Sequence, residues 1–423
     1  MNHFELKGGE LTCEDVPLAG IAEAVGTPVY VYSSATLERH YAVLRDALVG
    51  EGLGEPLIAY AVKANSNVAV LRTLARLGAG ADVVSEGEMR RALAAGVPPE
   101  RIVFSGVGKT RAEIAFALQA HVAEINVESE PELRLVDAVA RELGQRADVA
   151  IRVNPDVEAG GHAKISTGKA ENKFGVSLAE AERLYATAAG MAGVRPVGVA
   201  CHIGSQIADL APMEAAFRKL RALVERLRGE GLAVERLDLG GGLGVPYFNQ
   251  PAPPSPDAYA AMIARVMAGL DGVQFAFEPG RMIAANAGVL VARVLHVNAR
   301  PEGRRFLVLD AAMNDLLRPA MYDAWHDIRP VKPRPGAPVA YDVVGPICET
   351  GDTFTRDRAL PPLEPGDLVA FMTAGAYGAA MSSEYNSRPL APEVLVKGAD
   401  FAVVRPRPSY DDMLAREQGA PWL

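Results

Sequence analysis

The chain has 423 residues, 49% of them hydrophobic, which is enough for roughly two or three domains with large cores. Its net charge of −9 contains no long block of one sign, which argues against nucleic acid or an anionic membrane as a partner. Three separated cysteines, Cys13, Cys201 and Cys348, fit neither a disulfide framework nor a metal site and suit a reducing compartment. Neither an export signal nor a membrane-spanning run is visible, so we expect a cytoplasmic protein.

From about residue 56, short apolar runs alternate with longer amphipathic ones. The pattern predicts eight strands, at residues 57–62, 81–84, 102–104, 123–127, 149–153, 197–202, 237–239 and 275–278. Capping boxes are expected where four of the intervening helices begin, at Ser85/Glu88, Thr110/Glu113, Ser129/Glu132 and Ser177/Glu180. Eight such units predict a (β/α)8 TIM barrel. An open doubly wound sheet is the alternative, but no Gly-x-Gly-x-x-Gly follows the first strand.

After Arg281 the rhythm changes to strands separated by turns that contain proline and glycine. The expected strands are residues 289–297, 305–308, 339–344, 368–373 and 401–405. They predict an all-β C-terminal domain, a sandwich or barrel, with which the strand-like run at residues 28–32 is expected to pair. The predicted domains are therefore residues 36–282 for the barrel, and residues 1–35 with 283–423 for the β domain.

Catalytic residues of a (β/α)8 barrel gather at the carboxyl ends of its strands. The first predicted strand ends at Lys63, in Tyr-Ala-Val-Lys-Ala-Asn. A lysine that leaves a buried strand loses its proton more easily than a surface lysine and can attack a carbonyl or an aldehyde cofactor. A lysine that merely extends to solvent at a strand end is the structural alternative.

Four later strand ends carry further chemical groups. Asp82 lies on the second strand, and His202 ends the sixth, where an imidazole can lie on an aromatic ring or be a core histidine. Residues 240–242 are three glycines after the seventh strand, which form either a phosphate-binding turn or a flexible one. The eighth strand ends at Glu278, and Arg281 follows three residues later. A structural ion pair between them is the alternative to a role in the site. Together these groups predict pyridoxal 5′-phosphate as cofactor, because it requires a nucleophilic lysine, an imidazole, a phosphate-binding turn and a buried carboxylate.

These residues resemble the pyridoxal-phosphate enzymes of the alanine racemase-like fold type, and among them the diaminopimelate decarboxylase family. The resemblance runs through nearly the whole chain and is most specific at residues 348–352, Cys-Glu-Thr-Gly-Asp. It also includes a segment at residues 162–168, near which a mobile lid is expected at residues 160–173. The family's glycine and serine are replaced by Glu86 and Thr350, and neither change touches a proposed chemical group.

The resemblance implies a role for each site residue. Lys63 is expected to hold the cofactor covalently and Cys348 to donate a proton. The further cofactor-binding residues are expected to be Asp82, His202, Ser205, Gly241, Gly242, Glu278, Gly280, Arg281 and Tyr377. Glu278 is expected to face the pyridine nitrogen. Substrate binding is expected from Arg281, Arg318, Tyr322, Glu349 and Tyr377. No metal is expected, and the active unit is expected to be a homodimer in which Cys348 and Glu349 reach the partner's site.

The implied reaction is decarboxylation of meso-2,6-diaminopimelate to L-lysine and carbon dioxide, the last step of lysine synthesis. Arg318 and Glu349 suit this substrate, because its far end needs both a cationic and an anionic partner. Three alternatives stay open. The first is a decarboxylase of the same fold that acts on ornithine, arginine or carboxynorspermidine. The others are an amino-acid racemase, which Glu278 disfavours, and a non-catalytic cofactor carrier, which the β domain disfavours.

Overall fold

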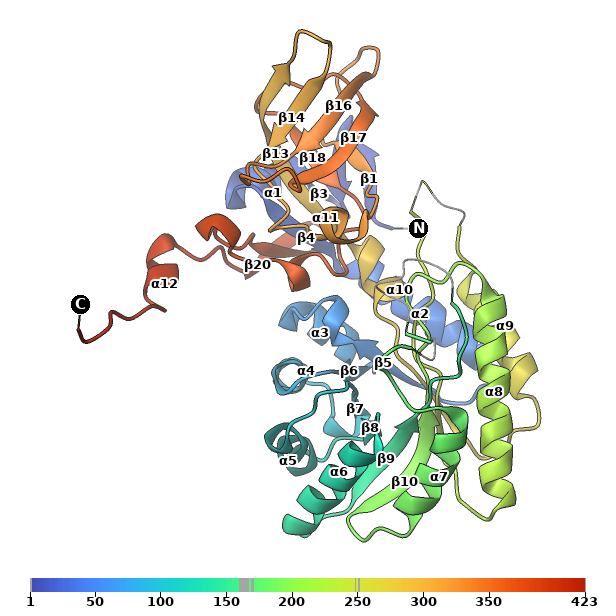
Figure 1. Ribbon diagram of the computed structural model, residues 1–423. Helices are drawn as coiled ribbons and strands as arrows, with labels where there is room; N and C mark the ends of the chain where they lie inside the picture. The colour runs from blue at the N-terminus through green and yellow to red at the C-terminus, as the bar shows by residue number, and fades with distance from the viewer. Residues whose placement is uncertain (1, 160–166, 169–170, 248, 250–251, 423) are drawn as a thin grey trace. The chain divides into compact units, whose positions relative to one another are not determined.

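The computed structural model describes residues 2–159, 167–168, 171–247, 249 and 252–422 (Figure 1). The chain divides into two compact units. One consists of Met1–Leu37, Tyr247–Gln250 and Ala284–Leu423, and is called here the β unit. The other consists of Glu38–Pro246 and Pro251–Ile283, and is called the barrel unit.

The barrel unit contains a closed barrel of eight parallel strands. The strands are β5 (Leu57–Ala61), β6 (Gly80–Val83), β7 (Ile102–Phe104), β8 (Glu124–Val127), β9 (Ala147–Arg152), β10 (Val194–Ala200), β11 (Arg236–Asp238) and β12 (Gln274–Phe277). β12 pairs with β5 and closes the barrel. The predicted (β/α)8 barrel is therefore confirmed, with strand limits that differ by a few residues.

Helices lie around the outside of these strands (Figure 1). They are α3 (Val68–Ala75), α4 (Glu86–Ala95), α5 (Arg111–Ala120), α6 (Glu130–Glu142), α7 (Leu178–Ala189), α8 (Leu210–Gly229) and α9 (Pro256–Met267), and α2 (Ser34–Gly50) precedes β5. In α8, Met213, Phe217, Leu220 and Leu227 are buried at helical spacing. Burying each such side chain contributes about 1.5–3 kcal/mol, which holds the helix against the strands.

The predicted helix starts are confirmed, but the predicted capping boxes are only partly right. Ser85, Thr110, Ser129 and Ser177 each accept the N–H of the glutamate three residues later. The reciprocal bond closes the box at Thr110. The carboxylates of Glu88 and Glu132 instead accept the N–H groups of Val84 and Glu128, the residues just before the caps. These carboxylates therefore fix the strand-to-helix turns of β6 and β8.

The β unit is built on a nine-stranded sheet whose main path is β17-β16-β14-β13-β4-β19-β20. Its strands are β4 (Val29–Ser33), β13 (Gly288–Ala299), β14 (Arg305–Leu309), β15 (Ile328–Pro330), β16 (Val339–Val344), β17 (Thr353–Leu360), β18 (Leu368–Phe371), β19 (Glu393–Lys397) and β20 (Asp400–Arg405). β4 pairs with β13 and β19, so the expected pairing of residues 28–32 with the C-terminal strands is confirmed.

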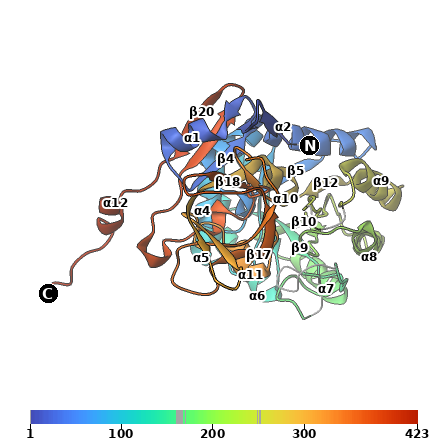
Figure 2. The same cartoon turned by 90° about the horizontal axis from the view of Figure 1, so that it is seen from above.

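A small second sheet and short helices complete the β unit. The sheet consists of β1 (Phe4–Lys7), β2 (Glu10–Cys13) and β3 (Val16–Pro17). The helices include α1 (Leu18–Val25), α11 (Arg318–Tyr322) and α12 (Tyr410–Leu414), and the four-residue α10 (Arg281–Ala284) spans the junction of the two units in the sequence. α12 and residues 415–422 after it extend away from β20 in both views (Figures 1 and 2). Among the helices described, none has the length and apolar character needed to cross a membrane.

Candidate active site

Lys63 lies just beyond β5, in the 3₁₀ turn Val62–Ala64, and its side chain is 36% exposed. Its Nζ forms an ion pair with Oδ2 of Asp82 on the neighbouring strand β6. Asp82 is fully buried, and its Oδ1 has no hydrogen-bond partner within the described part of the chain. A buried carboxylate therefore holds the amine at the carboxyl end of the barrel and retains the capacity to accept another donor.

His202 follows β10 and carries no charge near neutral pH. Burial, reinforced by the positive charges of Arg152 and Lys63, holds the pKa of its imidazole well below 6.5. Its Nδ1 accepts the N–H of Gly241 at 3.2 Å, so the ring proton is on Nε2. A neutral ring fixed by the backbone in this way can pack against an aromatic ligand.

The glycine turn after β11 brings three strand ends close together. Gly240 and Gly242 have φ angles of +66° and +112°, which side chains rarely permit. A Cβ at Gly240 would collide with the carbonyl oxygen of Cys201, and one at Gly241 with that of Glu278. The Gly240 N–H donates to Oδ1 of Asp238 at 2.8 Å. The glycines are therefore required because the backbone after β11 passes directly over its neighbours.

Ser205 and Arg281 form a polar pair near this turn. Nε and Nη2 of Arg281 donate to Oγ of Ser205 at 3.2 and 3.1 Å, and Arg281 is 7% exposed. Arg281 directly follows Gly280 and begins α10. The guanidinium and the hydroxyl both present donors suited to an anionic group.

Glu278, at the end of β12, is 8% exposed and belongs to a cluster of buried carboxyl groups. Burial, with the nearby carboxylates of Asp238 and Asp82, holds its pKa well above 4.5. Its Oε1 accepts Oγ–H of Ser105 at 3.2 Å, and Ser105 accepts Nδ2–H of Asn126 at 3.0 Å. A buried carboxyl group in this position is stabilised by a cationic or N–H donor that binds at the carboxyl end of the barrel.

In the β unit, the predicted substrate residues Arg318 and Tyr322 begin and end α11. Arg318 is 6% exposed, its Nη1 lies 2.9 Å from Nε2 of His326, and its guanidinium lies 5.3 Å from the centre of the Tyr247 ring. Nδ1 of His326 donates to the carbonyl oxygen of Met372, so Nε2 accepts from Arg318. The arginine is thus held in place by a neutral imidazole.

Cys348 and Glu349 lie on an exposed turn between β16 and β17. The buried carboxylate of Asp352 holds this turn by accepting the N–H groups of Met313 and Ile347, both at 2.7 Å. Tyr377, with φ of +56°, lies in a glycine-containing turn after β18. The site residues of the β unit are therefore Arg318 and Tyr322 on one helix, and Cys348, Glu349 and Tyr377 on turns.

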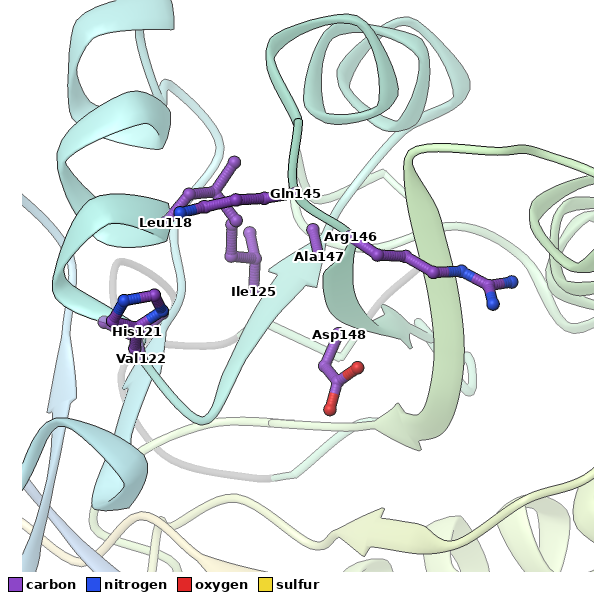
Figure 3. A pocket seen from close by; sticks show the side chains of 8 residues that line it. All are labelled: Leu118, His121, Val122, Ile125, Gln145, Arg146, Ala147 and Asp148. Carbon is purple, nitrogen blue, oxygen red and sulfur yellow. The ribbon is translucent and has the colours of Figure 1, made fainter. Parts of the chain in front are cut away.

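A pocket of about 290 Å³ lies at the other end of the barrel (Figure 3). It is bordered by the end of α5 and the first residues of β8 and β9, and its lining residues are Leu118, His121, Val122, Ile125, Gln145, Arg146, Ala147 and Asp148. Lys63, His202 and Glu278 lie at or beyond the carboxyl ends of their strands, so this pocket is separate from the candidate active site.

Comparison with known proteins now gives the family. A family model described as "Pyridoxal-dependent decarboxylase, pyridoxal binding domain" matches residues 35–285. The chain is 50% identical to diaminopimelate decarboxylase of Zymomonas mobilis over 421 residues, 99% of each chain. It is 38% identical to the crystal structure of diaminopimelate decarboxylase from M. jannaschii in co-complex with L-lysine, with a TM-score of 0.94 and 100% of both chains covered. The chain belongs to the diaminopimelate decarboxylase family.

A decarboxylase with another substrate is also similar, but less so. The crystal structure of lysine/ornithine decarboxylase from Vibrio vulnificus, complexed with putrescine, is 26% identical with a TM-score of 0.79, and 90% of this chain and 97% of that chain are covered. The predicted resemblance to the diaminopimelate decarboxylase family is confirmed, because the diaminopimelate decarboxylases share far more of the sequence.

The matched region is a pyridoxal-binding domain, which confirms the predicted cofactor, pyridoxal 5′-phosphate. The residues of this chain fit that group. The amine of Lys63 is paired with Oδ2 of Asp82, whose Oδ1 has no partner among the described residues, the His202 ring is neutral, and Glu278 is a buried carboxyl group. The glycine turn permits close approach of the backbone, as a phosphate requires.

A buried charge network beside these residues was not predicted from the sequence. Glu128, at the end of β8, accepts Nη1–H of Arg152 at 2.7 Å and the N–H groups of Gly106 and Gly175, both at 3.0 Å. Arg152 also lies 5.0 Å from the centre of the Phe174 ring. These contacts fix the positive charge that helps to keep His202 neutral. The signal in the sequence was the position of Glu128 and Arg152 at successive strand ends.

The predicted motif at residues 162–168 is described only at Thr167 and Gly168. Oγ–H of Thr167 donates to the carbonyl oxygen of His202 at 2.7 Å. The rest of this motif, and most of the mobile lid expected at residues 160–173, lie outside the described residues.

Proposed function

We propose that the chain decarboxylates meso-2,6-diaminopimelate to L-lysine and carbon dioxide with pyridoxal 5′-phosphate as cofactor. The observation that carries this proposal is the set of Lys63, Asp82, His202 and Glu278 at the strand ends of a barrel whose sequence is a pyridoxal-binding domain. We place this set in a domain of residues 36–282, and Arg318, Cys348, Glu349 and Tyr377 in a second domain.

The bound cofactor supplies an electron sink for the electron pair released when the carbon–carbon bond breaks. Lys63 would hold the cofactor covalently through Nζ. Glu278 would keep the pyridine nitrogen of the cofactor protonated, and the neutral imidazole of His202 would bind its aromatic ring. The remaining polar groups of the cofactor would be held by Ser205, Gly241, Gly242, Gly280, Arg281 and Tyr377.

The substrate has two amino-acid ends of opposite configuration. Because the product is L-lysine, the D-configured end loses its carboxylate and the L-configured end is recognised. Arg281, Arg318, Tyr322 and Tyr377 bind carboxylates, and Glu349 binds the distal ammonium. Loss of carbon dioxide leaves a carbon that must gain one proton, and Cys348, which is exposed, donates it from Sγ. The thiolate then regains a proton from water.

The test of the proposed function is product formation from a set of substrates. Protein loaded with pyridoxal 5′-phosphate is expected to release one carbon dioxide and form one L-lysine per meso-diaminopimelate. In heavy water, the lysine should carry one deuterium, at the carbon that lost carbon dioxide. Release from ornithine, arginine or carboxynorspermidine should be slower by at least about 10²-fold in kcat/KM, because these substrates lack the second amino-acid carboxylate that the buried Arg318 is proposed to bind. Faster release from any of them would favour the alternative function, and racemisation of the substrate would favour the racemase.

We also propose that the active unit is a homodimer with shared sites in the cytoplasm, in which Cys348 and Glu349 serve the partner's cofactor. Both residues are exposed on this chain, whereas proton delivery requires a site closed to water. Lys63→Ala and Cys348→Ala, each inactive alone, are expected to recover about a quarter of wild-type activity after subunit exchange. Random pairing makes half of the dimers hybrid, and each hybrid has one intact site of two. Hybrid dimers that form without regaining activity would contradict shared sites.

A further inference from the structure

A second turn contacts the exposed turn that carries Cys348 and Glu349. Oη–H of Tyr385 donates to Oε2 of Glu349 at 2.7 Å, and Nδ2–H of Asn386 donates to Sγ of Cys348 at 3.3 Å. Both donors belong to the 3₁₀ turn Tyr385–Ser387, for which no role is predicted from the sequence. Two consecutive side chains thus contact the two residues assigned to proton transfer and to ammonium binding.

The donating turn is fixed from both sides. Ser383 exchanges two hydrogen bonds with Asn314, since its N–H donates at 2.9 Å and its carbonyl accepts at 3.1 Å. Glu384 accepts Nη2–H of Arg416 through both carboxylate oxygens, at 2.6 and 2.7 Å. Asn386 has φ of +56°, which asparagine tolerates better than most residues. These hydrogen bonds therefore hold Tyr385 and Asn386 in defined positions, although both residues are exposed.

These contacts restrict two side chains that would otherwise be mobile. An exposed glutamate has many rotamers, and fixing it on binding costs conformational entropy. The Tyr385 hydroxyl occupies Oε2 of Glu349 and directs the carboxylate. The Asn386 amide binds a sulfur lone pair of Cys348, which leaves the S–H of that thiol to act as donor.

We propose that Tyr385 and Asn386 are positioning residues for the decarboxylation: Tyr385 orients Glu349 toward the distal ammonium of the substrate, and Asn386 orients the sulfur of Cys348 for proton delivery. The proposal rests on the proposed function. Tyr385 therefore contributes to substrate selectivity and Asn386 to the proton-transfer step.

The proposed role of Tyr385 is tested with Tyr385→Phe, which removes only the hydroxyl. KM for meso-diaminopimelate is expected to rise about tenfold with kcat changed by less than about twofold, as for loss of one charged hydrogen bond. The rise should vanish in the Glu349→Gln background, because Tyr385 acts through Glu349. Tyr410→Phe, an exposed tyrosine on α12, is the matched control. A wild-type KM in Tyr385→Phe, or an effect that adds fully to that of Glu349→Gln, would overturn this role.

The proposed role of Asn386 is tested with Asn386→Asp, which keeps the shape but replaces the donor amide. We expect kcat to fall about tenfold and the solvent deuterium isotope effect on kcat to rise, since proton transfer becomes slower. If side-chain shape alone mattered, Asn386→Asp would behave as wild type and Asn386→Ala would not, and that result would overturn the proposal.

A second measurement is independent of the reaction. Cys348 is exposed, whereas Cys13 and Cys201 are buried, so iodoacetamide labels Cys348 selectively in the cofactor-free protein. A carboxylate beside the sulfur opposes the nucleophilic thiolate, so Asn386→Asp should slow alkylation about tenfold. An unchanged rate would show that residue 386 does not contact the sulfur. If alkylation slows but wild-type protein releases no carbon dioxide from meso-diaminopimelate, the proposed function fails while the contact stands.

Discussion

Lys63→Ala is expected to lose both the absorbance of the covalently bound cofactor and at least about 10³-fold of turnover, because the nucleophile and an acid–base group disappear together. The change also leaves Asp82 buried without its ammonium partner. An unpaired buried carboxylate is destabilising, so the cofactor-free variant should unfold at a lower temperature than wild type. Absorbance spectroscopy, carbon dioxide release and thermal unfolding measure the three effects.

Two further variants separate chemistry from stability. Asp82→Asn added to Lys63→Ala removes the unpaired charge, so stability should recover while turnover does not. Lys7→Ala breaks an exposed lysine–aspartate pair of similar type, with Asp15, and should change neither activity nor stability by much, since surface pairs contribute about 0–1 kcal/mol. Borohydride reduction followed by peptide mapping should find the cofactor on residue 63.

Lys109 is the alternative to Lys63 as the lysine that holds the cofactor; it is buried and is not among the site residues predicted from the sequence. Burial lowers the pKa of its ammonium, as expected for a nucleophilic lysine. However, its Nζ donates to Glu132 at 2.8 Å and to the carbonyl oxygens of Gly106 and Asn126 at 2.7 and 2.6 Å. All three protons are engaged, so Lys109 is a structural cation. Cofactor trapped on Lys109 would contradict the assignment of Lys63.

This contrast shows what could be predicted from sequence. The eight barrel strands were predictable because each is an apolar run of strand length between amphipathic helices, and the strand ends then gave Lys63, His202 and Glu278. The ion pair of Glu128 with Arg152 was not predicted, because the sequence places both residues at strand ends but does not show whether charged side chains there are buried or exposed. Their burial depends on neighbouring strands and helices that only the folded barrel brings together.

The β unit was harder to predict for a related reason. β17 alternates only weakly, since most of its residues are exposed or half-buried and several are charged. β1, β2 and β3 are two to four residues long, too short for a clear period. Tyr385 contacts Glu349 and Asn386 contacts Cys348, and these pairs are 36 and 38 residues apart in the sequence. No local sequence pattern predicts contacts over such separations.

Glu278→Gln is expected to lower kcat about 10²- to 10³-fold, because a neutral amide cannot stabilise a proton on the pyridine nitrogen as a carboxylate does. The variant should still bind the cofactor through Lys63, so the absorbance of the covalently bound cofactor remains, although its pH dependence changes. Steady-state kinetics with meso-diaminopimelate and a spectroscopic pH titration measure these effects. Wild-type kcat in this variant would remove Glu278 from the site.

The same substitution has a consequence for the cofactor-free protein. Burial, then Asp238 and Asp82, raise the pKa of Glu278 above 4.5, while Lys63 and Arg152 oppose the rise. A carboxyl group with a raised pKa in the folded state contributes stability that is fully present below its unfolded pKa and is lost as pH rises through the folded pKa. The loss is about 1.4 kcal/mol for each pH unit that separates the two pKa values. Wild-type protein should therefore lose stability between about pH 4.5 and the raised pKa, and Glu278→Gln should lose less.

Asp238→Asn separates the effect of Glu278→Gln on kcat from its effect on the pH dependence of stability. Asp238 belongs to the same buried cluster, and burial raises its pKa as well, but its Oδ1 is engaged by the Gly240 N–H. The variant should reduce the pH-dependent loss of stability to a similar extent and lower kcat much less than Glu278→Gln does. If both variants lower kcat equally, catalysis depends on the charge of the cluster as a whole. If Glu278→Gln loses stability with pH as steeply as wild type, Glu278 is not the carboxyl group that titrates.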